Sequence, residues 1–244
     1  VSSSGSLIFM LIGFLSGISA GAGVIVARFF GAGDEKNLQR AVHTTVAFGL
    51  VAGVLMTGVG VALSPQILRW MDTPESVMRE SVTYLQIYFA GSLGFVMYNV
   101  LVGILQAVGD SRHPLYYLIV SSVINLVLDL LFITGFHTGV GGAAVATVIS
   151  QIVSALLCFW QLLRTKESYG LKIRKIRFDK GILVQIIKIG LPSGVQNSII
   201  AFANVIVQSN INAFGEMAMA GYGAYTKVEG FGFLPINSFT MALT

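Results

Sequence analysis

Long apolar stretches separated by short polar connections dominate the pattern of this sequence. A helix needs about 20 apolar residues to cross the hydrocarbon core of a bilayer, and each stretch approaches or exceeds that length. Seven such segments lie at roughly 5–30, 41–63, 81–107, 114–136, 140–163, 181–213 and 218–244. The pattern therefore predicts an all-α integral membrane protein, a polytopic helical bundle with seven helices in this chain.

The distribution of charge supports a membrane protein and orients it. Only 11% of the residues are charged and 55% are hydrophobic, whereas a soluble domain carries about 25% charged residues. The cations gather in alternate connections: Lys36, Arg40, Arg112 and the basic stretch 164–180 form one set, and Arg69 and Arg79 form the other. Because cytoplasmic connections are richer in Lys and Arg, the first set is cytoplasmic, and we expect a multi-pass protein of the cell (cytoplasmic) membrane.

The basic stretch is also the one boundary of domain scale. We predict an N-terminal lobe at 1–163 that lacks its first helix, a cytoplasmic basic linker at 164–180, and the first two helices of a C-terminal lobe at 181–244. The chain enters from the outer side and ends within an apolar run, so we expect it to be part of a longer protein. Apolar residues punctuate the linker, which either lies on the membrane surface or is solvated. They are Leu171, Ile173, Ile176 and Phe178.

Small residues recur every four positions in two segments. Gly13, Gly17 and Gly21 do so in the first segment, and the fifth carries Gly142, Ala146, Ser150 and Ser154. This spacing lets helix backbones approach closely, so a packing role is predicted for both stripes.

Asp129 carries the only formal charge between Pro114 and Phe136. A carboxylate near the middle of a membrane helix costs roughly 2.5–3.5 kcal/mol on insertion scales, so it needs an internal partner, a hydrated cavity or a bound cation. Asn125 lies one helical turn earlier on the same face. Together the two side chains form a candidate site.

Two further segments place aromatic or amide side chains along one face. The third carries Tyr84, Tyr88, Phe95, Asn99 and Gln106, and the sixth carries Ser193, Asn197, Asn204, Gln208 and Asn212. Such faces either line a cavity suited to bulky organic ligands or make interhelical hydrogen bonds. For Tyr84 and Tyr88 the alternative is packing in the interfacial aromatic belt.

The seventh segment adds two deep charges, Lys227 and Glu229. Their spacing points them to different sides of a helix, so they are not a simple pair. Lys227 can reach the outer surface along its flexible stem, and Glu229 is a candidate for the substrate cavity.

Signs of enzyme chemistry are missing from the sequence. His43, His113 and His137 lie at segment ends or in connections without metal-site spacing. There is no glycine-rich phosphate loop, nucleophile elbow or cluster of carboxylates for Mg²⁺. The single cysteine, Cys158, lies in an apolar run. We expect no enzymatic activity, no nucleic-acid partner and no organic cofactor.

Four stretches in order along the chain resemble the multidrug and toxic compound extrusion (MATE) transporters. Val26–Gly33 resembles the end of that family's second helix, and Ile104–Pro114 resembles the junction of its fourth and fifth helices. Asn125–Ile133 with Gly139–Thr147 is similar to the fifth and sixth helices, and Gly190–Asn197 to the start of the seventh. The resemblance covers nearly the whole chain, as helices two to eight.

The resemblance implies a twelve-helix antiporter of two six-helix lobes that exports bulky, often cationic organic compounds against Na⁺ or H⁺. It implies a cation site of Asn125, Asp129 and Thr147, which in several members is completed by an acidic residue on the first helix. One branch carries a glutamate on helix seven at the position that is Ile200 here. This departure favours the DinF-like bacterial branch.

We therefore expect a cation-coupled antiporter that works by alternating access as a monomer, with small organic substrates and membrane lipid as partners. Asp129, Asn125 and Thr147 would bind the coupling cation, Na⁺ as a hard ion with oxygen ligands or H⁺ favoured by burial. The expected substrate cavity contains Tyr88, Phe95, Asn99, Gln106, Asn197, Asn204, Gln208 and Glu229.

Three competing hypotheses stay open at the level of the sequence. The nearest is a flippase of lipid-linked oligosaccharide in the same superfamily, which would need a more cationic cavity than Arg28, Lys188 and Lys227 offer. A membrane-embedded prenyl transferase would need clustered acidic residues for Mg²⁺. In the third hypothesis the chain is a packing protein, with Asp129 as interhelical glue.

Overall fold

The computed structural model describes residues 2–70, 75–136, 139–212 and 216–243, and every regular element in these ranges is helical. The α-helices are α1 (Ser2–Gly31), α2 (Glu35–Trp70), α3 (Glu75–Ala90), α4 (Ser92–Ala107), α5 (Arg112–Leu130), α6 (Gly139–Arg164), α7 (Lys180–Asn212) and α8 (Glu216–Leu243). A π-helical turn, η1 (Leu131–Gly135), extends α5, and a 3-10 turn, η2 (Ile173–Lys175), lies in the linker.

Several of these helices are long and apolar enough to cross a membrane. Among the described residues they are Glu35–Arg69, Arg112–Gly135, Gly141–Arg164 and Lys180–Asn204, and α3 with α4 forms a fifth if the bent pair is one span. In α1 the apolar part Gly17–Gly31 is shorter. The predicted class, a polytopic helical membrane protein, is confirmed.

The predicted third segment, 81–107, is wrong in one respect, because it is not a single helix. It is broken at Gly91, and the two parts are bent by 45°. A Cβ on Gly91 would lie 2.4 Å from a methyl group of Val148 in α6, so only glycine allows this approach. Beside the break, the Ser92 hydroxyl lies 2.7 Å from the Phe89 carbonyl oxygen and 3.0 Å from the Thr57 hydroxyl.

The small-residue stripes pack as the sequence predicts. A Cβ on Gly17 would lie 2.2 Å from the backbone nitrogen of Gly194, and one on Gly21 would lie 2.4 Å from that of Gly190. The backbones of α1 and α7 therefore touch where the glycines face each other. In α6 the stripe is buried from Gly142 to Ser154, and Gly13 lies outside the residues whose side-chain surroundings are described.

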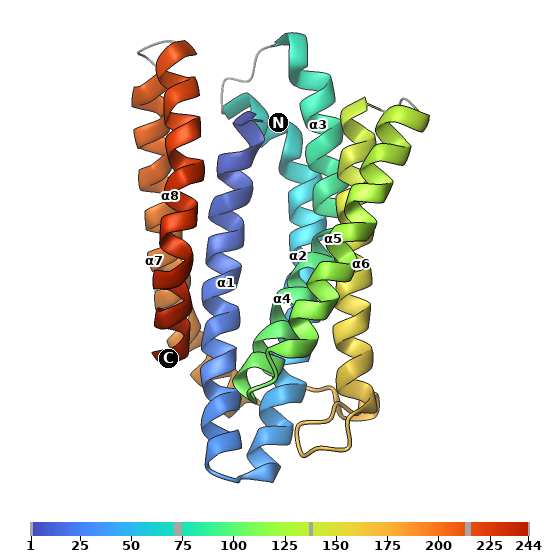
Figure 1. Cartoon of the computed structure of the whole chain (residues 1–244). Coiled ribbons are helices and arrows are strands. Elements are labelled where there is room, and N and C mark those ends of the chain that lie inside the picture. The colour runs from blue at the N-terminus through green and yellow to red at the C-terminus, as the bar shows by residue number, and fades with distance from the viewer. Residues whose placement is uncertain (1, 71–74, 137–138, 213–215, 244) are drawn as a thin grey trace. The chain divides into compact units, whose positions relative to one another are not determined.

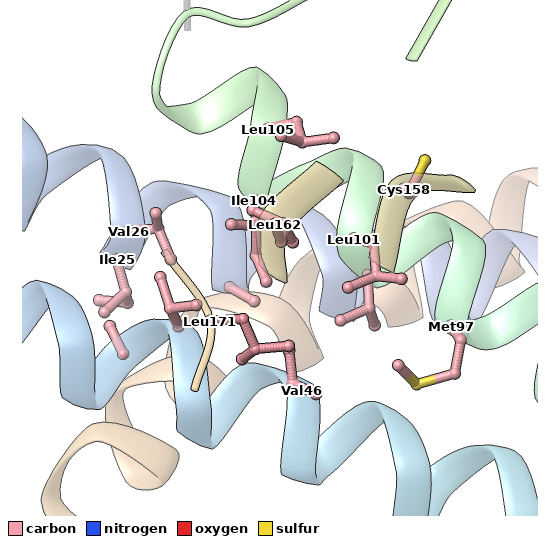
Figure 2. Close-up of a cluster of buried hydrophobic side chains, with 14 of the residues drawn as sticks. Ile25, Val26, Val46, Met97, Leu101, Ile104, Leu105, Cys158, Leu162 and Leu171 are labelled. Carbon is pink, nitrogen blue, oxygen red and sulfur yellow. The ribbon is translucent and has the colours of Figure 1, made fainter. Parts of the chain in front are cut away.

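The core of the first unit lies around α4, which packs against α1, α2 and α6 in the bundle drawn in Figure 1. Figure 2 shows Ile25 and Val26 of α1, Leu101 and Ile104 of α4, and Leu162 of α6 converging there. Large apolar side chains such as Val54, Leu126 and Leu156 are more than half exposed on the outer faces of their helices. Apolar side chains on the outer faces as well as in the core are typical of helices that face lipid.

The basic linker is docked against α2, while most of its side chains from Lys172 to Phe178 stay exposed, so a linker on the membrane surface and a solvated linker both remain predictions. Leu171 is buried in the core and Ile176 packs against it, whereas Ile173 and Phe178 are exposed. Hydrogen bonds from α2 to the linker backbone hold it in place, including one of 3.1 Å from the Gln39 side-chain nitrogen to the Gly170 carbonyl oxygen.

The chain divides into two compact units, Val1–Ser198 and Ile199–Thr244. The second unit holds the end of α7 and α8. Within it, Tyr222 and Tyr225 stack with ring centroids 6.0 Å apart, and the Tyr225 hydroxyl donates a 3.0 Å hydrogen bond to Glu229. The predicted lobe boundaries remain a prediction.

Candidate cation site in the α5–α6 hairpin

A tight turn before α5 sets where that helix begins. Gly109 has φ of +85°, a left-handed conformation that glycine adopts without strain. The next residue, Asp110, then accepts a 3.2 Å hydrogen bond from the backbone N–H of His113, and its other carboxylate oxygen lies 2.7 Å from the His113 Nδ1. This carboxylate satisfies a donor in the first turn, which fixes the start and hence the phase of α5.

Helical phase separates two faces of α5 near its end. Leu126, Val127 and Leu130 are 56–61% exposed, as expected for side chains that face lipid. Asn125 and Asp129 are half-buried on the other face, one turn apart. The polar pair is thereby turned toward the protein, as the sequence predicts.

Both polar side chains contain a buried atom without a protein partner. Asp129 Oδ1 and Asn125 Nδ2 are shielded from solvent, and neither makes a hydrogen bond within the described part of the chain. An unsatisfied buried polar atom costs about 1–3 kcal/mol, and more when it is charged. An unpartnered carboxylate oxygen at membrane depth is therefore the feature of this hairpin that most needs a ligand.

Thr147 of α6 is suited to supply a second oxygen. It is half-buried, and its hydroxyl donates its proton to the Ala143 carbonyl oxygen at 2.9 Å. The hydroxyl lone pairs are then directed away from that bond and can accept a hydrogen bond or bind a cation.

The antiparallel α5–α6 hairpin places Thr147 on the arm opposite Asp129. The helices α5 and α6 pack along their lengths, and at the far end the Tyr117 hydroxyl donates a 3.3 Å hydrogen bond to Gln161 Oε1. Asp129 and Thr147 lie at equal sequence distances from residue 138 in the connection, and so do Asn125 and Gln151. From this symmetry about the connection we infer that each pair lies at a similar height in the hairpin.

Two neighbours of this site are absent from the predicted set. Gln151 Oε1 is another buried oxygen without a partner among the described residues, and it lies one turn beyond Thr147 on the same face of α6. Tyr84 of α3 lies close enough for the charge of Asp129 to act on its phenol. From the sequence, Tyr84 belongs either to a cavity-lining face or to the interfacial aromatic belt. Gln151 could have been found by pairing the two arms of the hairpin about their connection.

The donor set fits a hard cation or a proton. Carboxylate, hydroxyl and amide oxygens are the ligands that alkali and alkaline-earth ions prefer. Among the described residues no three His, Cys, Asp or Glu side chains come together, so the arrangement does not resemble a transition-metal site.

The predicted cavity residues of the third segment are divided by the break at Gly91. Tyr88 stays in α3, where its ring stacks on that of Tyr84, and Phe95 packs against the core from α4. The amide of Asn99 donates a 2.8 Å hydrogen bond to the Phe95 carbonyl oxygen in the preceding turn, and Gln106 is exposed. The broken helix therefore does not present these four residues along one straight face.

The predicted cavity residues of α7 and α8 are described less completely. Asn197 is half-buried, Asn204 is exposed, and Glu229 accepts the hydrogen bond from Tyr225. The side chains of Gln208 and Lys227 lie outside the described residues. The structure brings Asn125, Asp129 and Thr147 into one hairpin, but a shared substrate cavity stays a prediction.

Comparison with known proteins identifies the family. The MatE family model matches residues 1–131, which is more than half of the chain. The chain belongs to the MATE family. A curated relative, the probable multidrug resistance protein YoeA of Bacillus subtilis (strain 168), is 33% identical over 251 aligned positions, covering 100% of this chain and 54% of that protein.

Solved MATE structures share the fold. An outward-facing multidrug resistance MATE family transporter superimposes with a TM-score of 0.87 at 26% identity, covering 97% of this chain and 53% of that one. An inward-facing structure gives a TM-score of 0.82 at 27% identity, covering 95% and 53%. The chain thus spans about half the length of the relatives it matches.

Membership of the MATE family confirms the resemblance seen in the sequence and makes the chain part of a multi-pass membrane transporter family. The DinF-like branch stays a prediction. The α5–α6 hairpin contains the stretches Asn125–Ile133 and Gly139–Thr147, which resemble the fifth and sixth MATE helices. The predicted cation site comes from these two stretches.

Proposed function

We propose that the protein is a cation-coupled MATE antiporter that exports bulky, often cationic organic compounds across the cytoplasmic membrane. The observation that carries this proposal is the buried Asp129 Oδ1, which has no hydrogen-bond partner among the described residues. A charge that is expensive to bury and has no protein partner is explained by a ligand that comes and goes.

The coupling ion is Na⁺ or H⁺. For Na⁺, the Asp129 carboxylate supplies the charge and the Thr147 hydroxyl a neutral ligand. Rotation of the Asn125 amide by half a turn exchanges its buried nitrogen for its oxygen, which would add a third ligand. For H⁺, protonation neutralises the carboxylate and converts one oxygen into a donor.

Ion binding at this position can bias a conformational equilibrium. The hairpin packs on α3 and α4, which are bent against each other at Gly91. An ion that binds one conformation more tightly shifts the population toward that conformation. The size of the shift is set by the difference between the ion's affinities for the two conformations. Transport of the organic substrate is coupled if the substrate prefers the opposite conformation.

The proposed substrates follow from relatives and from the aromatic and amide residues of α3, α4 and α7. YoeA is named as a probable multidrug resistance protein, and both solved structures are described as multidrug resistance transporters. We expect small organic substrates and surrounding lipid as partners, a monomer, and no nucleic-acid binding.

The test is ethidium efflux from cells that express the complete gene, with Asp129→Asn compared with Glu80→Gln, an exposed carboxylate of α3. Asn keeps the size of the side chain but removes its charge. The expected result is that Asp129→Asn abolishes ion-driven efflux at unchanged membrane expression, whereas Glu80→Gln retains it. Undiminished efflux by Asp129→Asn would sink the proposal.

A further inference from the structure

A second site lies away from the hairpin, where the linker meets the first turns of α2. A cavity of about 640 Å³ opens there between the helix and the linker. Five cations line it: Lys36, Arg40, Arg174, Lys175 and Arg177. Two carboxylates, Glu35 and Asp179, also line it. The distribution of charge along the chain places this end of the bundle on the cytoplasmic side.

The cavity is built by specific contacts between α2 and the linker. The buried His43 accepts a 3.0 Å hydrogen bond from the Lys172 backbone N–H at Nε2, while its Nδ1 lies 2.5 Å from the Gln39 carbonyl oxygen. The buried Thr44 hydroxyl accepts a 3.1 Å hydrogen bond from the Asp179 backbone N–H. Because these contacts fix the linker backbone on both sides of Arg174–Arg177, the positions from which those cations extend are fixed too.

The carboxylates offset little of this positive charge. Asp179 Oδ1 accepts hydrogen bonds from the backbone N–H groups of Gly181 and Ile182, at 3.1 and 3.2 Å, and so caps α7. Its other oxygen lies 3.8 Å from Arg40, the one ion pair of this cavity among the described residues. Lys36, Arg174, Lys175 and Arg177 are exposed and make no ion pair with any described carboxylate. The cavity therefore offers several cations for an anion.

Exposed apolar side chains beside these cations indicate where the anion comes from. Ile173 is 61% exposed and Phe178 is 44% exposed, one on each side of Arg174–Arg177. Phe30, 40% exposed at the end of α1, contacts Tyr169 of the linker edge to face. Aromatic and apolar side chains interleaved with cations suit the interface of a bilayer rather than open water.

We propose that this cavity binds the phosphate of an anionic phospholipid headgroup in the inner leaflet, with Ile173 and Phe178 inserted beside its acyl chains. The cations attract the headgroup, and the apolar side chains lose their exposure to water. The linker is thereby held against the membrane surface as well as against α2. This site does not depend on ion coupling at Asp129.

The experiment uses protein from the complete gene, purified in uncharged detergent, and counts bound lipid by native mass spectrometry across phosphatidylglycerol concentrations. The test variant is Arg174→Gln/Lys175→Gln/Arg177→Gln. The matched control, Arg69→Gln/Arg79→Gln/Arg112→Gln, removes the same charge from exposed positions outside the cavity. Each cation near the membrane surface contributes roughly fivefold to binding, so the test variant should bind phosphatidylglycerol at least about 10-fold more weakly. The control should change it less than about threefold.

Three further arms separate the sources of the anion. Phosphatidylcholine should not displace phosphatidylglycerol, and inorganic phosphate at millimolar concentration should not either. Ile173→Ser/Phe178→Ser should weaken lipid binding while leaving any effect of inorganic phosphate unchanged. If the triple variant aggregates, the exposed Arg174→Gln alone should still weaken binding by about fivefold. Equal losses in the test and control variants, or full competition by inorganic phosphate, would overturn the proposal.

Discussion

At the scale of single residues, the molecule is organised around oxygens that lack partners. Asp129 Oδ1 and Gln151 Oε1 are both buried without a hydrogen bond to the described protein. Folded proteins satisfy most buried polar atoms, so two such oxygens on the two arms of one hairpin indicate a site for a ligand. The Thr147 hydroxyl, which donates to the Ala143 carbonyl oxygen, adds a further oxygen one turn before Gln151 on the same face of α6.

The hydroxyl of Thr147 can be tested without disturbing the shape of the site. Thr147→Val removes the oxygen and keeps the branched side chain, and we expect it to weaken the apparent affinity for the coupling ion by about 10-fold. Thr147→Ser keeps the oxygen and should restore most of it. The measurement is the ion concentration that gives half-maximal stabilisation of the purified protein. Equal affinities for Val and wild type would exclude Thr147 as a ligand.

Replacing Gln151 should raise the stability of the ion-free protein and reduce its stabilisation by the ion. Gln151→Met removes an unpartnered oxygen at similar length, so the ion-free protein should gain about 1 kcal/mol in stability. The same change should reduce the stabilisation by the coupling ion. Thermal unfolding with and without the ion measures both effects. A lower midpoint without ion would mean that the amide already has a partner and plays a structural role.

At the scale of elements, the sequence predicts the helices better than their interruptions. Six of the predicted segments correspond to single α-helices, five of them without a break and one, at 114–136, with the π-helical turn η1 at its end. The break at Gly91 was missed because the residues on both sides are apolar or small and keep helical periodicity. The break is favoured by the close approach of Gly91 to Val148 of α6. A local sequence pattern contains no information about this contact between helices.

Candidate residues show the same division. Asp129 and Asn125 can be predicted from the sequence alone, because a charged residue stands out in an apolar segment and its neighbour one turn away follows from helix geometry. Thr147 is predicted only through the family resemblance. That Gln151 and Tyr84 lie beside this site is not visible in the sequence, because it depends on which helices pack together. The docking of the linker depends on His43 and Thr44, which lie far from it in the sequence.

The contact between α1 and α7 yields a prediction with a matched control. Gly17→Ala places a Cβ against the Gly194 backbone, so we expect a lower thermal midpoint and loss of close packing. Gly58→Ala makes the same change in α2 where nothing lies within 4 Å of the new atom, and helix propensity should raise the stability by roughly 0.5–1 kcal/mol. Relative to wild type, the thermal midpoint should fall for Gly17→Ala and rise for Gly58→Ala. Equal midpoints would show that the contact contributes nothing.

At the scale of the whole molecule, the chain has the fold of the MATE transporters, the family to which it belongs. The chain matches about half the length of its MATE relatives and superimposes on solved members in outward- and inward-facing states. Since Asn125, Asp129 and Thr147 all lie within this half, their part in ion binding can be tested apart from the identity of the exported substrate.

Dependence of efflux on the two ion gradients tells which ion is coupled. If the ion is Na⁺, ethidium efflux should fall when the Na⁺ gradient is removed and persist with a protonophore. If the ion is H⁺, the reverse should hold. Efflux that survives the loss of both gradients would contradict ion-coupled antiport by the intact protein.

The central claim is that Asp129 binds the coupling ion, and the most direct test is ion-dependent stability of the purified protein. Wild-type protein should show a thermal midpoint that rises with Na⁺ at constant ionic strength, or one that shifts with pH if the ion is H⁺, because a ligand of the folded state stabilises it. Asp129→Asn should lose that response, and Glu80→Gln should keep it. An undiminished response in Asp129→Asn would contradict the account.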